Sequence, residues 1–293
     1  MKQSVQRFIP AIFVLVWSTG FIVARYGMPY SEPMTFMFLR FTGVLLVMLP
    51  VVLIQRVAWP SRQESMHIAI AGVMLQAGYL GGVWAAVKLG MSASLVALIM
   101  GLQPILTACF AAFVSERLSA RQIIGLLAGL TGVGLVVMTK LTLVGLSFLS
   151  LSLAGLALAS ITFGTLYQKR FCPSFDLRAG SVLQFGASAV VCLPFMFLFE
   201  SRDIDWTFPM IAALLWSVFA LSIGAISLLF VMIRDGAATK VTSYLYLTPP
   251  TTALMAWVLF DETITAMTIF GTAVTVVGLI LVTKPPAITR EQR

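Results

Sequence analysis

The sequence predicts an all-α integral membrane protein with ten transmembrane helices, built from two inverted five-helix repeats. Three observations predict this fold. Hydrophobic residues make up 59% of the 293-residue chain and charged residues only 10%, whereas soluble domains carry about 25% charged residues. Ten apolar runs are each long enough to cross a bilayer. The pattern of Gly90–Lys140 then recurs in Gly236–Pro286.

Each apolar run contains at least about 20 residues, the length that a helix needs to cross about 30 Å of hydrocarbon. Lipid offers backbone groups no partner, and the runs are continuous rather than alternating, so we expect helices and not a barrel. The first run follows Lys2 and Arg7 without a small-residue cleavage site, so we interpret it as a retained helix. The predicted spans are Phe8–Met28, Pro33–Ile54, Met66–Lys88, Gly90–Val114, Ala120–Thr139, Gly145–Gln168, Ala179–Phe199, Phe208–Ile233, Ala237–Phe260 and Ile264–Thr283.

Basic residues separate by side when ten spans are assumed. With the N-terminus inside, fourteen of the nineteen Lys and Arg residues fall in inner segments and four in outer ones, with Arg40 inside a span. This asymmetry predicts cytoplasmic N- and C-termini in a bacterial-type inner (plasma) membrane. It also assigns the net charge of +8 to inner loops rather than to nucleic-acid binding.

The repeat is seen when the sequence is shifted by 146 residues. This shift pairs Gly78 with Gly224, Pro104 with Pro250 and Glu116 with Glu262, and it also pairs glycines further along; a shift of 144 pairs Phe41 with Phe185. Chance matching of apolar sequence does not readily give so many ordered coincidences. We therefore divide the chain into residues 1–140 and 141–293. Because each half has an odd number of spans, the second half enters the membrane from the opposite side, as in many secondary transporters.

Three segments carry a family resemblance. FVSERLSARQIIGLLAGLTGVGLVVM, its later counterpart VLFDETITAMTIFGTAVTVVGLILV, and the opening WSTGFIVARYG resemble the EamA family of the drug/metabolite transporter superfamily. The resemblance covers nearly the whole chain and implies a ten-helix exporter of small metabolites. Within the superfamily, the sequence is most similar to bacterial aromatic amino acid exporters.

Prolines mark the centre of the predicted bundle. Pro104 lies inside the fourth span, and Pro249 and Pro250 lie inside the ninth. Each proline removes a helical hydrogen bond, as at the carbonyl of Met100. Such carbonyls persist in a membrane only where a neighbour, water or ligand meets them. The matched positions therefore favour a substrate site between the repeats over kinks used for packing alone.

Other side chains at this depth are mostly aromatic or uncharged. Each alone is also compatible with packing or lipid contact, but together they predict an aromatic-walled cavity for flat apolar or cationic ligands. The predicted substrate-binding residues are Trp17, Tyr79, Met100, Gln103, Pro104, Trp216, Ser243, Tyr244, Tyr246 and Pro250. The predicted gating or hinge residues are Gly78, Gly224, Pro104, Pro249 and Pro250. We expect Glu116 and Glu262 to stabilise the start of the helix that follows each of them.

No acidic residue lies deep in a predicted span, which favours uniport or exchange over obligate proton coupling. Arg40 is the single charge at depth. It is either a counter-ion for a substrate carboxylate or an arginine that braces helices or reaches outward. Cys109, Cys172 and Cys192 have no metal or redox spacing, and no catalytic motif is present, so we expect no cofactor and no enzymatic activity.

These features predict an exporter of aromatic or other apolar amino acids that works by alternating access through a central cavity. The expected partners are the small-molecule substrate and membrane lipid, without nucleic acid, and the expected state is a monomer. One alternative is a multidrug-type exporter of lipophilic cations, although such sites usually offer a carboxylate. A non-transporting membrane enzyme or receptor is the alternative from another class, and the repeat with its paired prolines argues against it.

Overall fold

The computed structural model describes residues 3–115, 120–144, 147–172, 174–225, 227–228 and 247–283. Every regular element in these ranges is a helix, as the composition predicts. Within the described residues, seven helices are long and apolar enough to cross a membrane, and shorter apolar helices cover Ala93–Thr107 and Ala266–Val282. The elements are α1 (Gln3–Gly27), α2 (Pro33–Ile54), α3 (Arg62–Gly72), η1 (Val73–Gly78), α4 (Tyr79–Lys88), α5 (Ala93–Met100), α6 (Gln103–Ser115), α7 (Ala120–Val144), α8 (Phe148–Phe171), α9 (Leu177–Phe199), α10 (Phe208–Leu215), η2 (Trp216–Ala225), α13 (Thr248–Phe260) and α14 (Ala266–Thr283).

Local sequence explains where several helices begin. Ser61 caps α3 and forms a reciprocal capping box with Glu64, which satisfies backbone N–H groups that the helix leaves free. The Ser92 and Ser147 hydroxyls cap α5 and α8 by accepting from the backbone N–H groups of Leu95 and Ser150, without a reciprocal bond. Pro33 starts α2, where its missing N–H costs nothing. The observed bounds of α2 are those predicted from the apolar run.

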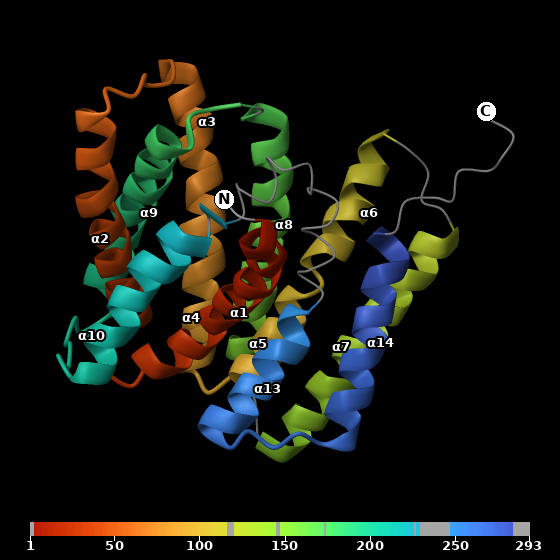
Figure 1. The fold of residues 1–293 in the computed structure, drawn as a ribbon. Coiled ribbons are helices and arrows are strands. Elements are labelled where there is room, and N and C mark those ends of the chain that lie inside the picture. The colour runs from red at the N-terminus through yellow and green to blue at the C-terminus, as the bar shows by residue number, and fades with distance from the viewer. Residues whose placement is uncertain are drawn as a thin grey trace, which may run out of the picture.

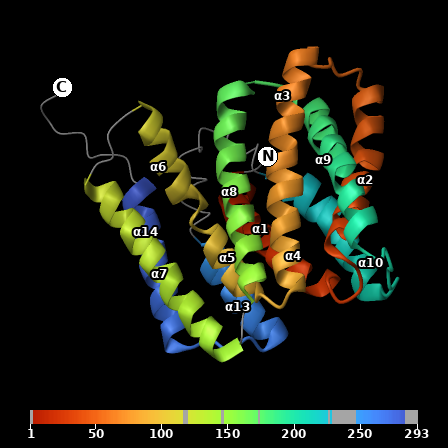
Figure 2. The same ribbon diagram turned by 180° about the vertical axis from the view of Figure 1, so that it is seen from behind.

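The helices pack into one bundle (Figure 1). Helices α2, α9 and α10 lie at one side, α6, α7 and α14 lie at the other, and α1, α4, α5, α8 and α13 lie between them, as the view from behind also shows (Figure 2). The pairs α7–α14, α2–α9, α4–α8 and α1–α13 are in contact. Large apolar side chains such as Phe148 and Phe199 are exposed on the outside, which fits a lipid environment.

Helices α7 and α14 meet through glycines. A Cβ atom added to Gly125 would lie 2.7 Å from the carbonyl oxygen of Gly278, and one added to Gly132 would lie 2.5 Å from that of Gly271. Residue numbers rise along α7 while those of its contacts fall along α14, so the two helices are antiparallel. Because these positions lack side chains, the two backbones approach closely, as is common between membrane helices.

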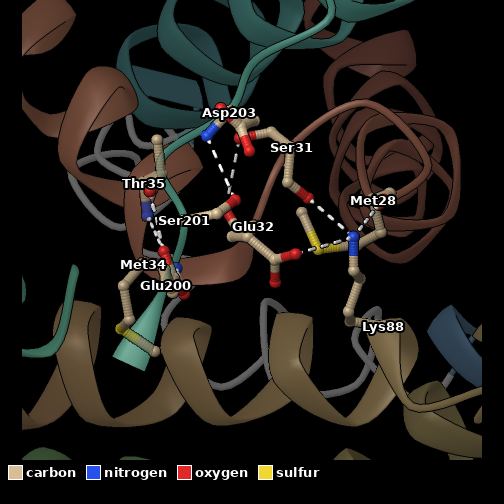
Figure 3. A network of polar contacts seen from close by, with 9 residues as sticks. All are labelled: Met28, Ser31, Glu32, Met34, Thr35, Lys88, Glu200, Ser201 and Asp203. Carbon is tan, nitrogen blue, oxygen red and sulfur yellow. Dashed lines mark hydrogen bonds and ion pairs between the residues drawn. The ribbon is translucent and has the colours of Figure 1, made fainter. Parts of the chain in front are cut away.

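Helices α2 and α9 form a second antiparallel pair. The buried rings of Phe41 and Phe185 lie 5.7 Å apart between their centroids. Near the start of α2, the carboxylate of Glu200 accepts hydrogen bonds from the backbone N–H groups of Met34 and Thr35, at 2.7 and 2.8 Å, and from the Thr35 hydroxyl (Figure 3). One carboxylate thus satisfies two N–H groups that the first turn of α2 leaves free.

Two helices contain wider π-helical segments. Segment η1 separates α3 from α4, and η2 continues α10. A shift of 146 residues places 73–78 on 219–224, inside η2, so both segments occupy the same region of the repeat pattern. The carbonyl of Met74 in η1 accepts a hydrogen bond of 2.9 Å from the Ser160 hydroxyl on α8. Such π segments occur often at functional sites.

Polar contacts gather at one end of the bundle, which we call the Glu262 end: α2 and α5 begin there, and α4, α9 and α13 end there. The Lys88 ammonium lies 3.4 Å from the Glu32 carboxylate and donates to the carbonyls of Met28 and Ser31, at 2.9 and 3.3 Å (Figure 3). Lys88 thereby ties the end of α4 to the loop between α1 and α2.

Glu262 makes the corresponding contact for α5. Its carboxylate accepts hydrogen bonds from the Ala93 backbone N–H and from the Ser94 hydroxyl. The sequence predicts that Glu262 stabilises the start of α14. In the structure, the Thr265 hydroxyl caps that start by accepting a hydrogen bond from the Thr268 N–H. Its repeat partner, Glu116, lies outside the described residues.

Candidate functional site

The two proline-containing segments are the starts of helices. The helix that begins as α5 breaks at Gly101–Leu102, and Pro104 is the second residue of α6. Pro249 and Pro250 lie in the first turn of α13. The sequence predicts kinks within continuous helices. The structure instead places the prolines where a missing N–H and a fixed φ angle suit a first helical turn.

The two segments meet. A Cβ atom added to Gly101 would lie 3.0 Å from Cγ of Pro249, so the break between α5 and α6 adjoins the start of α13. A partly open cavity lies at this meeting point and contains about 460 Å³ of space free of atoms, including space open to its surroundings. Its walls come from both halves of the chain. The lining residues are Trp17, Phe21, Tyr79, Ala97, Met100, Gly101, Gln103, Pro104, Ile161, Thr248, Pro249 and Leu279.

Three of the twelve lining residues are aromatic. Trp17 and Phe21 are four residues apart on α1 and therefore share one face of that helix. The Trp17 ring is held by Phe13, with 5.4 Å between their ring centroids. Tyr79 is buried and is the first residue after η1. The wall can therefore contact a flat apolar ligand through π faces and apolar surface.

Polar groups in the cavity are few and uncharged. The Gln103 amide donates to the hydroxyls of Thr107 and Thr165, at 3.4 and 3.3 Å. The Thr248 hydroxyl is buried without a hydrogen-bond partner in the described part of the chain. No acidic side chain is among the described residues that line the cavity. A ligand that offers a polar group could therefore satisfy Thr248, because an unmet buried hydroxyl carries a desolvation cost.

The structure brings six of the predicted site residues to this cavity and places others elsewhere. Trp17, Tyr79, Met100, Gln103, Pro104 and Pro249 line it. Trp216 does not: it begins η2, its side chain is 44% exposed, and its indole N–H donates to the Thr19 hydroxyl at 2.8 Å. Pro250 is exposed beside Pro249. Ser243, Tyr244 and Tyr246 lie outside the described residues.

The two predicted hinge glycines lie in the π segments. Gly78 ends η1, and a Cβ atom there would lie 2.2 Å from the Ser160 oxygen of α8. Gly224 lies inside η2, and its added Cβ would lie 3.1 Å from the carbonyl oxygen of Phe219. Gly78 is thus at a tight contact between helices, whereas the nearest atom to Gly224 belongs to its own segment.

Sequence reasoning missed several lining residues. Phe21 could have been found because it lies one helical turn from Trp17. Thr248 could have been found because it directly precedes Pro249. Ile161 and Leu279 carry no such signal, because each is one of many aliphatic residues in its helix. Among the described residues, no three His, Cys, Asp or Glu side chains gather as a metal site would require.

Comparison with known proteins adds a family match. The profile of the EamA-like transporter family matches residues 8–138 and again residues 147–284. A probable amino-acid metabolite efflux pump of Salmonella typhimurium is 26% identical over 284 residues, which cover 93% of this chain and 92% of that protein. An uncharacterised transporter of Bacillus subtilis is 27% identical, with coverage of 93% and 89%.

Two further likenesses agree with these. An uncharacterised inner membrane transporter of Escherichia coli K12 is 23% identical, with coverage of 93% of this chain and 89% of that protein. A solved crystal structure, titled only as that of a protein, superposes with a TM-score of 0.64 at 20% identity and covers 96% of each chain. At this identity, the likeness concerns the fold alone.

Proposed function

The chain belongs to the EamA-like transporter family, and on this premise we propose that it exports aromatic or other apolar amino acids through the cavity beside Pro104 and Pro249. The chain is a multi-pass membrane protein with inner-membrane transporters among its relatives. The observation that carries the substrate class is the cavity itself, whose walls are aromatic and apolar with a few uncharged polar groups. The efflux pump of Salmonella typhimurium, which its name links to amino-acid metabolites, supports the same class.

Ten spans in two inverted repeats are part of this proposal. Inverted repeats place equivalent helices antiparallel to each other around a two-fold axis in the membrane plane. The antiparallel pair α7–α14 supports this arrangement, because Gly125 contacts Gly278 and its repeat partner Gly271 contacts Gly132. Phe41 supports it as well, because it packs against its own repeat partner, Phe185.

Transport proceeds by alternating access, with the Glu262 end facing outward. At this end, Lys88, Glu200 and Glu262 each tie the end of one helix to the start or the approach of another. These contacts hold the outer end closed, and export requires that they break while the opposite end closes. The π segments and the helix breaks at the prolines are the hinges, because their hydrogen bonding already departs from the regular helical pattern.

Movement is by uniport or exchange. Proton-coupled carriers usually place an ionisable carboxyl group deep in the bundle. In the described part of the chain, the acidic residues nearest this role, Glu200 and Glu262, bind helix starts at the outer end. Collapse of the pH gradient with a fixed substrate gradient should therefore leave the transport rate unchanged.

Counterflow in proteoliposomes tests the proposal. Vesicles loaded with unlabelled L-phenylalanine should accumulate radiolabelled L-phenylalanine from outside, and empty vesicles should not. External L-tryptophan and L-leucine should compete, whereas tetraphenylphosphonium, a lipophilic cation, should not. Competition by the cation without competition by any amino acid would support a multidrug exporter instead. Absence of counterflow with either class would remove the proposed function.

A further inference from the structure

Arg40 is a buried cation that the proposed function has not yet used. It lies within α2, and its side chain is 5% exposed. In the described part of the chain, its one hydrogen bond runs from Nε to the Ser222 hydroxyl at 3.0 Å. The two ion pairs described there, Lys88–Glu32 and Arg178–Asp176, lie elsewhere. A charge at this depth costs at least about 2.5 kcal/mol, and a neutral hydroxyl offsets only part of such a cost.

Arg40 is not among the residues that line the cavity, but its helix, α2, packs against both α4 and η2. Tyr79, the first residue of α4, lines the cavity and interacts electrostatically with the Arg40 guanidinium. Ser222, which accepts the hydrogen bond from Arg40, belongs to the π segment η2. The positive charge is thus bonded to η2 and interacts with the residue that follows η1. In this apolar environment, the charge acts over a longer range than it would in water.

The fold does not require a charge at this position. The repeat partner of Arg40 is Gln184, which is also buried and also lies in a helix that packs against a π segment. The Gln184 amide donates to the side-chain oxygen of Gln168 at 2.9 Å. A neutral side chain therefore suffices at the equivalent place in the other half. Arg40 thus gives one half of the chain a buried positive charge that the equivalent position in the other half lacks.

We propose that Arg40 is the specificity-determining residue that makes the cavity select ligands carrying a carboxylate. The ligand's apolar body lies against Trp17 and Phe21, and its carboxylate lies toward Tyr79, where the field of Arg40 and the Tyr79 hydroxyl favour negative charge. The selected class is small organic acids with an apolar body, including zwitterionic amino acids. This inference rests on the proposed site for the substrate class, but it also holds for carboxylates that are not amino acids.

The test compares each carboxylate with its amide. Purified full-length protein in nanodiscs is titrated calorimetrically with L-tryptophan and L-tryptophanamide, and with 3-phenylpropionate and 3-phenylpropionamide. The wild-type protein should bind each carboxylate at least about tenfold more tightly than its amide, because hydrogen bonds and fields from charged groups are worth that much. Equal affinity within both pairs in the wild type overturns the proposal without any variant.

The variant Arg40→Gln installs the residue found at the equivalent position. It should weaken carboxylate binding by roughly 10- to 100-fold and change amide binding less than about twofold. Arg40→Lys should retain most of the preference, because it keeps the charge. If Arg40→Gln weakens both members of each pair equally, Arg40 braces helices and the proposal is wrong. Binding of 3-phenylpropionate but of neither tryptophan compound would keep this proposal and remove the amino-acid function.

Discussion

Replacing Gly132 by alanine should push α7 away from α14. The added Cβ would lie 2.5 Å from both the carbonyl oxygen of Gly271 and the hydroxyl oxygen of Thr275, and 2.7 Å from the backbone nitrogen of Thr275. Ordinary contact begins at 3.4 Å, so the closest approach falls about 0.9 Å short. Two of the three atoms are backbone atoms and cannot rotate away. The helices must therefore separate by about that distance along part of their length.

Overpacking of this kind costs about 1–3 kcal/mol. Helical alanine is intrinsically better than glycine by up to about 1 kcal/mol, which offsets part of the loss. Gly134→Ala is the matched control, because Gly134 lies on the same helix and its added Cβ would meet nothing within 4 Å. Relative to Gly134→Ala, which carries the same intrinsic gain, we expect Gly132→Ala to lower the free energy of unfolding by about 1–3 kcal/mol. Gly134→Ala should leave it unchanged or raise it slightly.

The free energy of unfolding is measured by denaturant titration of the purified protein, followed by intrinsic tryptophan fluorescence. The same proteins are then compared by Tm, and Gly132→Ala is expected to melt at least about 2 °C below Gly134→Ala. A stability of Gly132→Ala equal to that of Gly134→Ala would show that the two helices do not approach as closely as described, and the argument for their antiparallel glycine contact would fail.

Three further predictions concern other contacts. Glu262→Gln should destabilise the protein by roughly 1–2 kcal/mol by weakening the contact with α5, and Ser94→Ala should cost less in that background than alone; additive losses in denaturant titrations would contradict a shared contact. Trp17→Ala should weaken L-tryptophan binding at least about fivefold in calorimetry, whereas Trp216→Ala should change it less than about twofold; equal losses would refute the cavity assignment. Hydrogen bonds from Arg178 lower the pKa of Asp176 below its ordinary value. A lowered folded-state pKa stabilises above the ordinary pKa and ceases to do so as the pH falls through the folded-state value. The Tm advantage over Asp176→Asn should therefore shrink below about pH 4, and a constant advantage would contradict it.

Helix positions follow from sequence because the bilayer fixes length. The apolar run Pro33–Ile54 coincides with α2, and the run Ile264–Thr283 begins two residues before α14. Burial of backbone polar groups in lipid leaves helix as the available structure, so run length alone suffices. The bounds of helices that break were not predicted, because a break changes hydrogen bonding without changing hydropathy. The π segments η1 and η2 could not be predicted from the sequence for the same reason.

The site could be predicted by depth but not by helix face. Trp17 and Trp216 are both tryptophans within apolar spans, yet Trp17 faces the cavity and Trp216 bonds to Thr19 on α1. The orientation of Trp216 depends on how α10 passes into η2, and no repeating pattern in the sequence indicates that transition. The prolines were more informative, because Pro104 and Pro249 each constrain the backbone itself, although Pro250, the repeat partner of Pro104, is exposed. Their effect therefore does not depend on which way a side chain points.

The contact between α7 and α14 bears on whether the two halves need to be linked. Gly125 contacts Gly278 and Gly271 contacts Gly132, so α7 and α14 contact each other through equivalent surfaces. That reciprocity is the defining property of the interface in a two-fold symmetric homodimer. Such an interface needs no peptide link between its sides. Under the inverted-repeat arrangement proposed above, the same interface could form between two separate half-length chains in opposite orientations.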